Sequence, residues 1–331
     1  MSELRNRARE LYQQFPEDWQ VRFMNEFMTP RNVQELTNII GDIELEYSEP
    51  IVPLHSIPRR DQAQPRRWYL GPNENDGHWP LFKTYMKNEL EWGDHVIKSV
   101  HESSTEITGF LGNPGQREDY ATKGLVLGYV QSGKTANMAA VITKAIDAGY
   151  NTIIVLAGLT NALRKQTQER LEKDVVERIP QLWQKYTTIE SDLKVSPASQ
   201  LLKYSHMGRS GVNFLVVKKN VSPLKNLLKL IEQTHSSHRS ELRVLMIDDE
   251  CDQASVNSAR REGDITRINQ NIRKILKALY KVTYLGYTAT PFANVLINPY
   301  ANEEQLDDLY PKDFITSLPR PDAYFGAEKM F

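Results

Sequence analysis

The sequence predicts an α/β fold in which a mostly parallel sheet is flanked by helices and preceded by a helical N-terminal region. From residue 123 onward, short continuous apolar segments alternate with helix-forming segments. This alternation is typical of a parallel sheet that is covered by helices on both faces. Before that point the periodicity is helical, as in Trp19, Phe23 and Phe27, which recur at every fourth position.

We expect three segments in chain order. Residues 1–115 form the helical region, with a Pro-rich connector at about 49–80. Residues 116–300 form the α/β lobe, and residues 301–331 form a linker toward a missing C-terminal region.

The individual elements follow from apolar runs and helical periodicity. Strands are expected at 125–127, 151–157, 213–219, 242–247 and 282–287. Helices are expected at 17–27, 33–40, 79–110, 134–148, 161–173, 223–232 and 265–281. Residues 174–210 match neither pattern and are predicted to contain an insertion.

Two features of the N-terminal region have alternative interpretations. Arginines precede Trp68 and Tyr69, and such a pair can bind phosphate and stack on a base, for example adenine. Surface charge beside a buried aromatic pair is the interpretation we favour. The alternating acids Asp42, Glu44 and Glu46 either chelate a metal, as in nucleases, or form a solvated strand edge, which is more common.

Residues 128–135 fit the phosphate-loop pattern G-x-x-x-x-G-K-[ST], with an apolar strand before them and a helix after them. In such a loop, backbone N–H groups and the positive end of the helix dipole face phosphate oxygens. Lys134 is expected to reach the β- and γ-phosphates and Thr135 to hold Mg²⁺, so the predicted cofactors are ATP and Mg²⁺. The predicted cofactor-binding residues are Gly128, Gln131, Ser132, Gly133, Lys134 and Thr135.

An acidic segment, Asp248-Asp-Glu-Cys-Asp252, follows the strand predicted at 242–247. Carboxylates at the carboxyl end of a buried strand lie where doubly wound folds bind ligands. We assign Asp249 to the Mg²⁺ ligands and Glu250 to the attacking water, and Asp248 competes for the metal because the register is uncertain by one residue. The alternative is an acidic helix N-cap.

A third segment, Tyr287-Thr-Ala-Thr-Pro, follows the last predicted strand. The hydroxyls of Thr288 and Thr290 are expected to hydrogen-bond the acidic cluster, including Asp252, and to couple it to the rest of the protein. A Thr–Pro turn that closes a strand is the alternative.

Composition excludes several classes of protein. The 331 residues are 40% hydrophobic and 25% charged with a net charge of −1, so nucleic-acid binding must rest on a local surface. The chain has no apolar run of membrane-spanning length and no signal-peptide core. The single cysteine, Cys251, indicates a reducing compartment, and the seven histidines have no zinc-binding spacing. A cytoplasmic protein is expected.

The phosphate loop, Asp249-Glu-Cys-Asp252 and Thr288-Ala-Thr290 resemble motifs I, II and III of superfamily-two helicases. The resemblance implies a RecA-like lobe. It also places Leu163–Thr167 at the position of motif Ia, and Lys218 and Lys219 near motif Ib. The nucleic-acid contacts that it implies are Arg164, Gln166, Thr167, Lys218 and Lys219.

The sequence around these motifs resembles even more closely a bacterial helicase-like family that carries a Z-one domain. "GYVQSGKTANM", "IIVLAGLTNALRKQTQERL", "IDDECDQASVN" and "YTATPFANVLI" are all similar to it, over roughly residues 66–331. The resemblance implies an ATP-dependent enzyme, labelled an endonuclease, that acts on DNA in restriction-like anti-phage systems. Its partners would be DNA, a nuclease or other defence subunit, and a C-terminal Z-one region or second RecA-like lobe.

One departure from superfamily-two motors concerns the second lobe, which supplies an arginine finger in those proteins. No second lobe follows in this sequence, and an arginine finger contributes about 10³–10⁵ in turnover. We therefore expect the chain alone, a fragment or one piece of a split system, to hydrolyse ATP slowly or not at all. An ATP-gated adaptor that recruits a nuclease without translocating is the alternative, and a nuclease that uses Glu44 is a third.

Overall fold

The computed structural model describes residues 2–15, 19–29, 32, 36, 39–40, 67–128, 133–201, 205–206, 209–252, 262–289, 309 and 311–319. Residues 49–66 of the Pro-rich connector and most of the helix predicted at 33–40 lie outside these ranges. The acids Asp42, Glu44 and Glu46 lie outside them as well.

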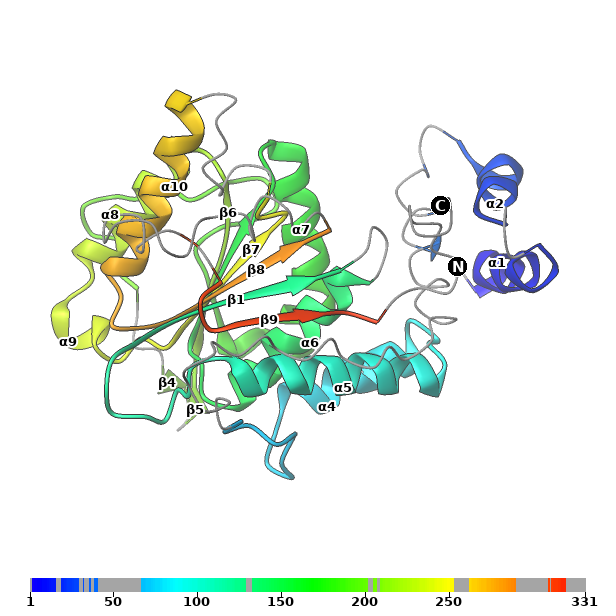
Figure 1. Cartoon of the computed structure of the whole chain (residues 1–331), viewed down its shortest axis with the longest axis horizontal. Coiled ribbons are helices and arrows are strands. Elements are labelled where there is room, and N and C mark those ends of the chain that lie inside the picture. Colours follow the sequence, from blue (N-terminus) through cyan, green and yellow to red (C-terminus); the bar gives the residue numbers. More distant parts are fainter. Residues whose placement is uncertain are drawn as a thin grey trace.

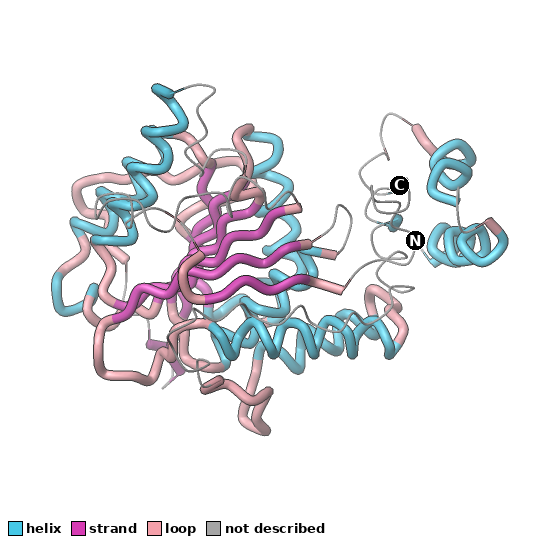
Figure 2. The backbone as a smooth tube through the Cα atoms, viewed as in Figure 1, coloured by secondary structure: helices cyan, strands magenta, loops and turns pink. Residues whose placement is uncertain are grey.

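Seven strands form one sheet in the order β3-β6-β2-β7-β8-β1-β9, and each neighbouring pair is parallel. Figure 2 shows these strands side by side through the centre of the molecule. They are β1 (Tyr120–Leu127), β2 (Thr152–Ala157), β3 (Trp183–Lys185), β6 (Val212–Lys218), β7 (Val244–Asp249), β8 (Lys281–Thr288) and β9 (Phe314–Ser317). The predicted fold class is confirmed.

Helices precede the sheet and connect its strands (Figure 1). They are α1 (Ser2–Gln14), α2 (Trp19–Phe27), α4 (His78–Asn88), α5 (Asp94–Phe110), α6 (Lys134–Asp147), α7 (Asn161–Asp174), α8 (Val221–Gln233), α9 (Ser236–Arg239) and α10 (Glu262–Lys277). The segment predicted as an insertion contains two 3₁₀ turns, Val176–Arg178 and Pro180–Leu182, then β3 and a small antiparallel pair of β4 (Ser205–His206) and β5 (Arg209–Ser210).

Side chains of the central strands alternate between two apolar cores, because successive residues of a strand point to opposite faces. In β2, Ile153 and Val155 belong to the core that includes α4, α5, α6 and α7. Ile154 and Leu156 belong to the core that includes α8 and α10. Burial on both faces explains why β2 reads as a continuous apolar run.

The helical N-terminal region is divided in its packing. Residues of α1 and α2 form a core of their own around Trp19 and Phe23. In contrast, α4 and α5 pack against α6 within the main core. The helical segment predicted at 79–110 is two helices, and the break between them includes Glu91 in a left-handed conformation (φ 55°).

Within residues 301–331, β9 pairs with β1 at the edge of the main sheet. Gly124 of β1 lies opposite Phe314, whose ring fills the space that a side chain would need. A Cβ at Gly124 would lie only 2.1 Å from Cζ of Phe314. Phe314 also stacks on Phe110, with 5.3 Å between ring centroids.

None of the helices in the described ranges has the length and apolar character needed to cross a membrane.

Candidate active site

The phosphate-loop sequence joins β1 to α6. Gly133 adopts a left-handed conformation (φ 69°) and is the N-cap of α6, a position that favours glycine. Because glycine has no side chain, the cap leaves the first N–H groups of α6 open toward a ligand. Lys134 and Thr135, the first two residues of the helix, are partly exposed. Gln131 and Ser132 lie outside the described residues.

The two acids at the end of β7 point to opposite faces of the sheet. Asp248 is fully buried, pairs with Lys219 (Nζ–Oδ1 3.0 Å) and accepts a hydrogen bond from the Tyr284 hydroxyl at 2.6 Å. Asp249 alternates with it and therefore faces the side of α6, the phosphate-loop helix. This placement favours Asp249 over Asp248 as the metal ligand.

Electrostatics connect Asp249 to the phosphate-loop lysine. Burial, together with the negative charge of Glu250, raises the pKa of Asp249 above its ordinary value. The positive charges of Lys219 and Lys134 act in the opposite direction. Lys134 therefore lies close enough to the acid to act on its charge, as a shared phosphate–metal site requires.

The chain turns sharply directly after Asp249. Glu250 is one of two described non-glycine residues with positive φ (52°), a conformation that is uncommon for such residues. Cys251 follows, buried against β8, and its amide donates to the carbonyl oxygen of Tyr287 at 3.0 Å. A Cβ at Gly286 would lie 2.8 Å from Sγ of Cys251, so the turn packs directly on the strand.

The predicted coupling residues meet at the end of β8. The Thr288 hydroxyl donates to Oδ1 of Asp252 at 2.7 Å. The carbonyl oxygen of Thr288 also accepts from the amide of Gly128, the first residue of the phosphate loop, at 2.9 Å. One residue thus contacts both the acidic segment and the phosphate loop. Thr290 lies outside the described residues.

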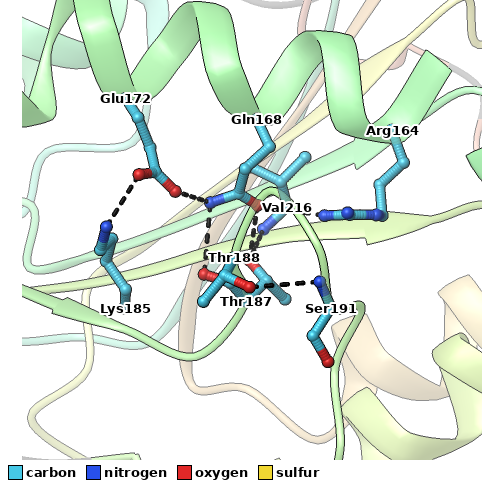
Figure 3. Close-up of polar contacts among 8 residues, drawn as sticks. All are labelled: Arg164, Gln168, Glu172, Lys185, Thr187, Thr188, Ser191 and Val216. Atoms are coloured by element: carbon cyan, nitrogen blue, oxygen red, sulfur yellow. Dashed lines mark hydrogen bonds and ion pairs between the residues drawn. The ribbon is translucent and has the colours of Figure 1, made fainter. Parts of the chain in front are cut away.

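Two of the five predicted nucleic-acid contacts are buried, which does not fit a contact at the surface. Arg164 is 3% exposed and donates to the carbonyl oxygen of Ile189 at 2.6 Å and to Gln168 at 3.3 Å. Gln168 in turn contacts Glu172 and Thr187, so these side chains of α7 form an interior polar network (Figure 3). The spacing of four residues between 164, 168 and 172 indicates that the three side chains of this network lie on one face of the helix.

Lys219 is the second buried candidate, since its ammonium pairs with Asp248 in the interior. The other three candidates reach the surface. Gln166 is exposed, Thr167 is partly exposed, and Lys218 contacts Asn161 at the start of α7 (Nζ–Oδ1 2.6 Å). A sequence pattern does not distinguish Lys218 from Lys219, although only one of them faces solvent.

Trp68 and Tyr69 are placed for packing and not for stacking on a base. Tyr69 is buried, and the indole N–H of Trp68 donates to the carbonyl oxygen of Leu111 at 2.6 Å. Arg67 pairs with Glu106 (2.6 Å) at the surface beside them. The interpretation of a buried aromatic pair beside surface charge fits this geometry.

The family model described as "Type III restriction enzyme, res subunit" matches residues 93–293, which is more than half of the sequence. The chain belongs to this family. The res-subunit family is a family of superfamily-two helicase-like ATPases, so the chain is helicase-like and nucleotide-binding in class.

Solved structures similar to this res-subunit chain include two of a Saccharomyces cerevisiae Dbp5 variant. In one, bound to Nup159, a Gle1 variant, IP6 and ADP, the identity is 14% and the TM-score 0.42, over 72% of this chain and 51% of that one. In the other, bound to RNA and ADP BeF3, the identity is 15% and the TM-score 0.35, over 62% of this chain and 46% of that one. The res-subunit chain thus spans about half the length of these chains. No curated protein matches its sequence.

A magnesium–nucleotide complex fits the residues of this site. The N-terminus of α6 and Lys134 suit phosphate, and Asp249 with Thr135 suits a magnesium ion that is also bound to phosphate. Among the described residues, no cluster of three or more His, Cys, Asp or Glu side chains has a metal-binding arrangement. Magnesium at phosphate sites commonly uses only one or two carboxylates.

Proposed function

We propose that this chain is the ATP-binding and ATP-hydrolysing lobe of a superfamily-two DNA translocase or helicase in a restriction-like anti-phage system. The observation that carries the proposal is the convergence of three strand ends on one site. The end of β1 leads to Lys134, the end of β7 carries Asp249, and the end of β8 contacts both segments through Thr288. Ligands of open α/β sheets bind at this edge.

Each residue has a separate task in the proposed hydrolysis. Lys134 and the first N–H groups of α6 neutralise and orient the β- and γ-phosphates. Thr135 and Asp249 hold Mg²⁺, which supplies further neutralisation of the phosphate charge when bound. Glu250, whose backbone φ of 52° ends the direction of the strand, orients the attacking water and accepts its proton.

Coupling between the acidic segment and the phosphate loop is proposed to pass through Thr288, because its hydroxyl donates to Asp252 and its carbonyl oxygen accepts from Gly128. Gln166, Thr167 and Lys218 form the proposed DNA-contacting surface at the start of α7. Arg164 and Lys219 are excluded from it by their burial.

Partners and location belong to the same proposal. The similarity to the Z-one family supports a C-terminal Z-one region or a second RecA-like lobe as a partner, together with a nuclease or another defence subunit. A second lobe that supplies an arginine finger would raise the turnover of this lobe by about 10³–10⁵. A single cysteine supports a cytoplasmic location.

Nucleotide affinity tests the assignment of the phosphate loop. Calorimetry with ATP is expected to show binding by the unaltered chain and none by Lys134→Ala. Lys225→Ala, which removes an exposed lysine from α8, is the matched control and should bind like the unaltered chain. Binding that persists in Lys134→Ala refutes the assignment.

DNA-dependent activity separates a motor from an ATP-gated adaptor. A motor shows DNA-stimulated ATP hydrolysis and displaces a strand or a bound roadblock when the partner lobe is present. An adaptor binds ATP and recruits a nuclease, with turnover that DNA does not change. That second result would replace the translocase by the adaptor.

A further inference from the structure

Lys219 contacts three successive residues at the end of β7, namely Asp248, Asp249 and Glu250. It directly follows β6, and its side chain is fully buried. Its ammonium lies 3.0 Å from Oδ1 of Asp248 and donates to the carbonyl oxygens of Asp249 at 2.6 Å and Glu250 at 2.7 Å. The side chain reaches past the end of β2, which lies between β6 and β7.

The convergence of two successive carbonyl groups on one nitrogen requires a change in backbone direction. In an extended strand, neighbouring carbonyl groups point to opposite sides. The ladder between β2 and β7 ends at Leu156 and Asp248, and Glu250 then adopts a left-handed conformation (φ 52°). A non-glycine residue stays in this region only where its surroundings hold it there. The Lys219 ammonium is such a constraint.

We propose that Lys219 is a positioning residue whose ammonium holds the backbone turn at Asp249–Glu250 and thereby sets the direction of both carboxylates. The proposal rests on the proposed ATPase function. It differs from a purely structural role, in which Lys219 only neutralises the buried charge of Asp248. Both roles make the residue important for folding, so the test must separate charge balance from the two carbonyl contacts.

A double variant makes that separation. Lys219→Met alone leaves the Asp248 carboxylate buried without its cation, which is strongly destabilising. Lys219→Met/Asp248→Asn removes both charges, and the amide oxygen still accepts from Tyr284. We expect the double variant to unfold at a higher temperature than the single variant. Both variants lack the hydrogen bonds from residue 219 to the carbonyl oxygens of Asp249 and Glu250.

The decisive measurements are nucleotide affinity with and without magnesium, and turnover. Calorimetry with the non-hydrolysable analogue AMP-PNP in EDTA should give the same affinity for the double variant and the unaltered chain, because the phosphate loop is intact. Mg²⁺ should increase the AMP-PNP affinity of the double variant by about 10–100-fold less than it does for the unaltered chain. The rate of ATP hydrolysis in single-turnover mixtures should fall by the same factor, as is typical when a group that orients metal ligands is removed.

Three further proteins complete the comparison. Lys144→Met removes another fully buried lysine, whose contacts lie between α5 and α6, and should keep the Mg²⁺-dependent tightening of nucleotide binding. If the methionine double variant does not fold, Lys219→Leu/Asp248→Asn also lacks both the charge and the N–H donors at position 219, and the same losses are expected. Lys134→Ala reports on the proposed function itself.

The outcomes are distinguishable. If a folded double variant keeps the tightening by Mg²⁺ and the turnover of the unaltered chain, Lys219 only balances the charge of Asp248 and the inference is overturned. An unaltered chain whose AMP-PNP affinity does not respond to Mg²⁺ overturns it as well. If Lys134→Ala binds nucleotide normally, the proposed function itself fails.

Discussion

Replacement of Lys144 by methionine should abolish a marked pH dependence of stability. The Lys144 side chain enters the core between α5 and α6, and its Nζ donates to the His101 carbonyl oxygen at 2.6 Å and to the hydroxyls of Ser104 and Thr105, each at 2.7 Å. It also lies 4.0 Å from the centroid of the Trp79 ring. None of its contacts within the described residues is a carboxylate, so burial is not offset by an opposite charge.

Burial lowers the pKa of Lys144 from 10.5 to about 6. Between these values the unfolded chain binds a proton that the folded chain does not, so the free energy of unfolding rises with pH. The contribution is largest above pH 10.5, decreases as the pH falls toward 6 and is constant below that. Linkage gives a gain of about 2.5 kcal/mol between pH 6.5 and 8.5. His101, whose pKa is lowered to about 4 by burial and the charge of Lys144, titrates below this window.

Urea unfolding at pH 6.5, 7.5 and 8.5 measures this effect. The unaltered chain should gain about 2.5 kcal/mol relative to Lys144→Met across the window, because titrations shared by both proteins cancel in the difference. Lys225→Met, at an exposed position on α8, should run parallel to the unaltered chain. Parallel lines for Lys144→Met would refute the reasoning. They would mean that the carbonyl group, the two hydroxyls and the indole keep the amine protonated inside the core.

Three further changes test the edge of the sheet, a helix start and the coupling contact. Gly124→Ala should lower the free energy of unfolding, measured by urea unfolding, by about 1–3 kcal/mol, because Phe314 must move away. A smaller loss is expected in a Phe314→Leu background, and equal losses in the two backgrounds would contradict the contact. Asp147→Ala should cost about 1–3 kcal/mol by thermal unfolding, because Asp147 accepts from three backbone N–H groups at the start of α4, and Asp147→Asn should cost less. Thr288→Val should reduce DNA-stimulated turnover by roughly tenfold or more without changing the Kd for ATP, since it removes the hydroxyl that bonds Asp252 and keeps the backbone bond to Gly128. A normal turnover would separate the residue from coupling.

The central strands were predictable because each is buried on both faces and reads as a continuous apolar run. The strand expected at 151–157 is β2, Thr152–Ala157, and that expected at 282–287 is β8, Lys281–Thr288. The edge strand β9 gives no such signal, because it is four residues long and pairs on one side only. Its position depends on the missing side chain of Gly124, a complementarity between segments 190 residues apart that no local pattern contains.

The motifs located the candidate site, whereas individual side chains near it were harder to place. Asp249 and Thr288 were predictable because each ends its strand, and Asp252 because it lies three residues after β7. Parallel strands bring such ends to one edge of the sheet. The burial of Arg164 and Lys219 was not predictable from residue type, since both residues are most often exposed. Their interior partners come from a loop at 187–191 and from β7, and the order of the strands decides which of these lies within reach.

Strand β8 lies between the strand that leads to the phosphate loop and the strand that leads to the acidic segment. The phosphate-loop strand β1 and the acidic strand β7 are not neighbours, and both pair with β8, which lies between them. Thr288 is in register with Leu127, and Tyr287 is in register with Asp249. A slip of one residue would turn Thr288 to the opposite face and remove its bond to Asp252. β8 thus links the phosphate loop to the acidic turn by hydrogen bonds, and its last residue, Thr288, contacts both.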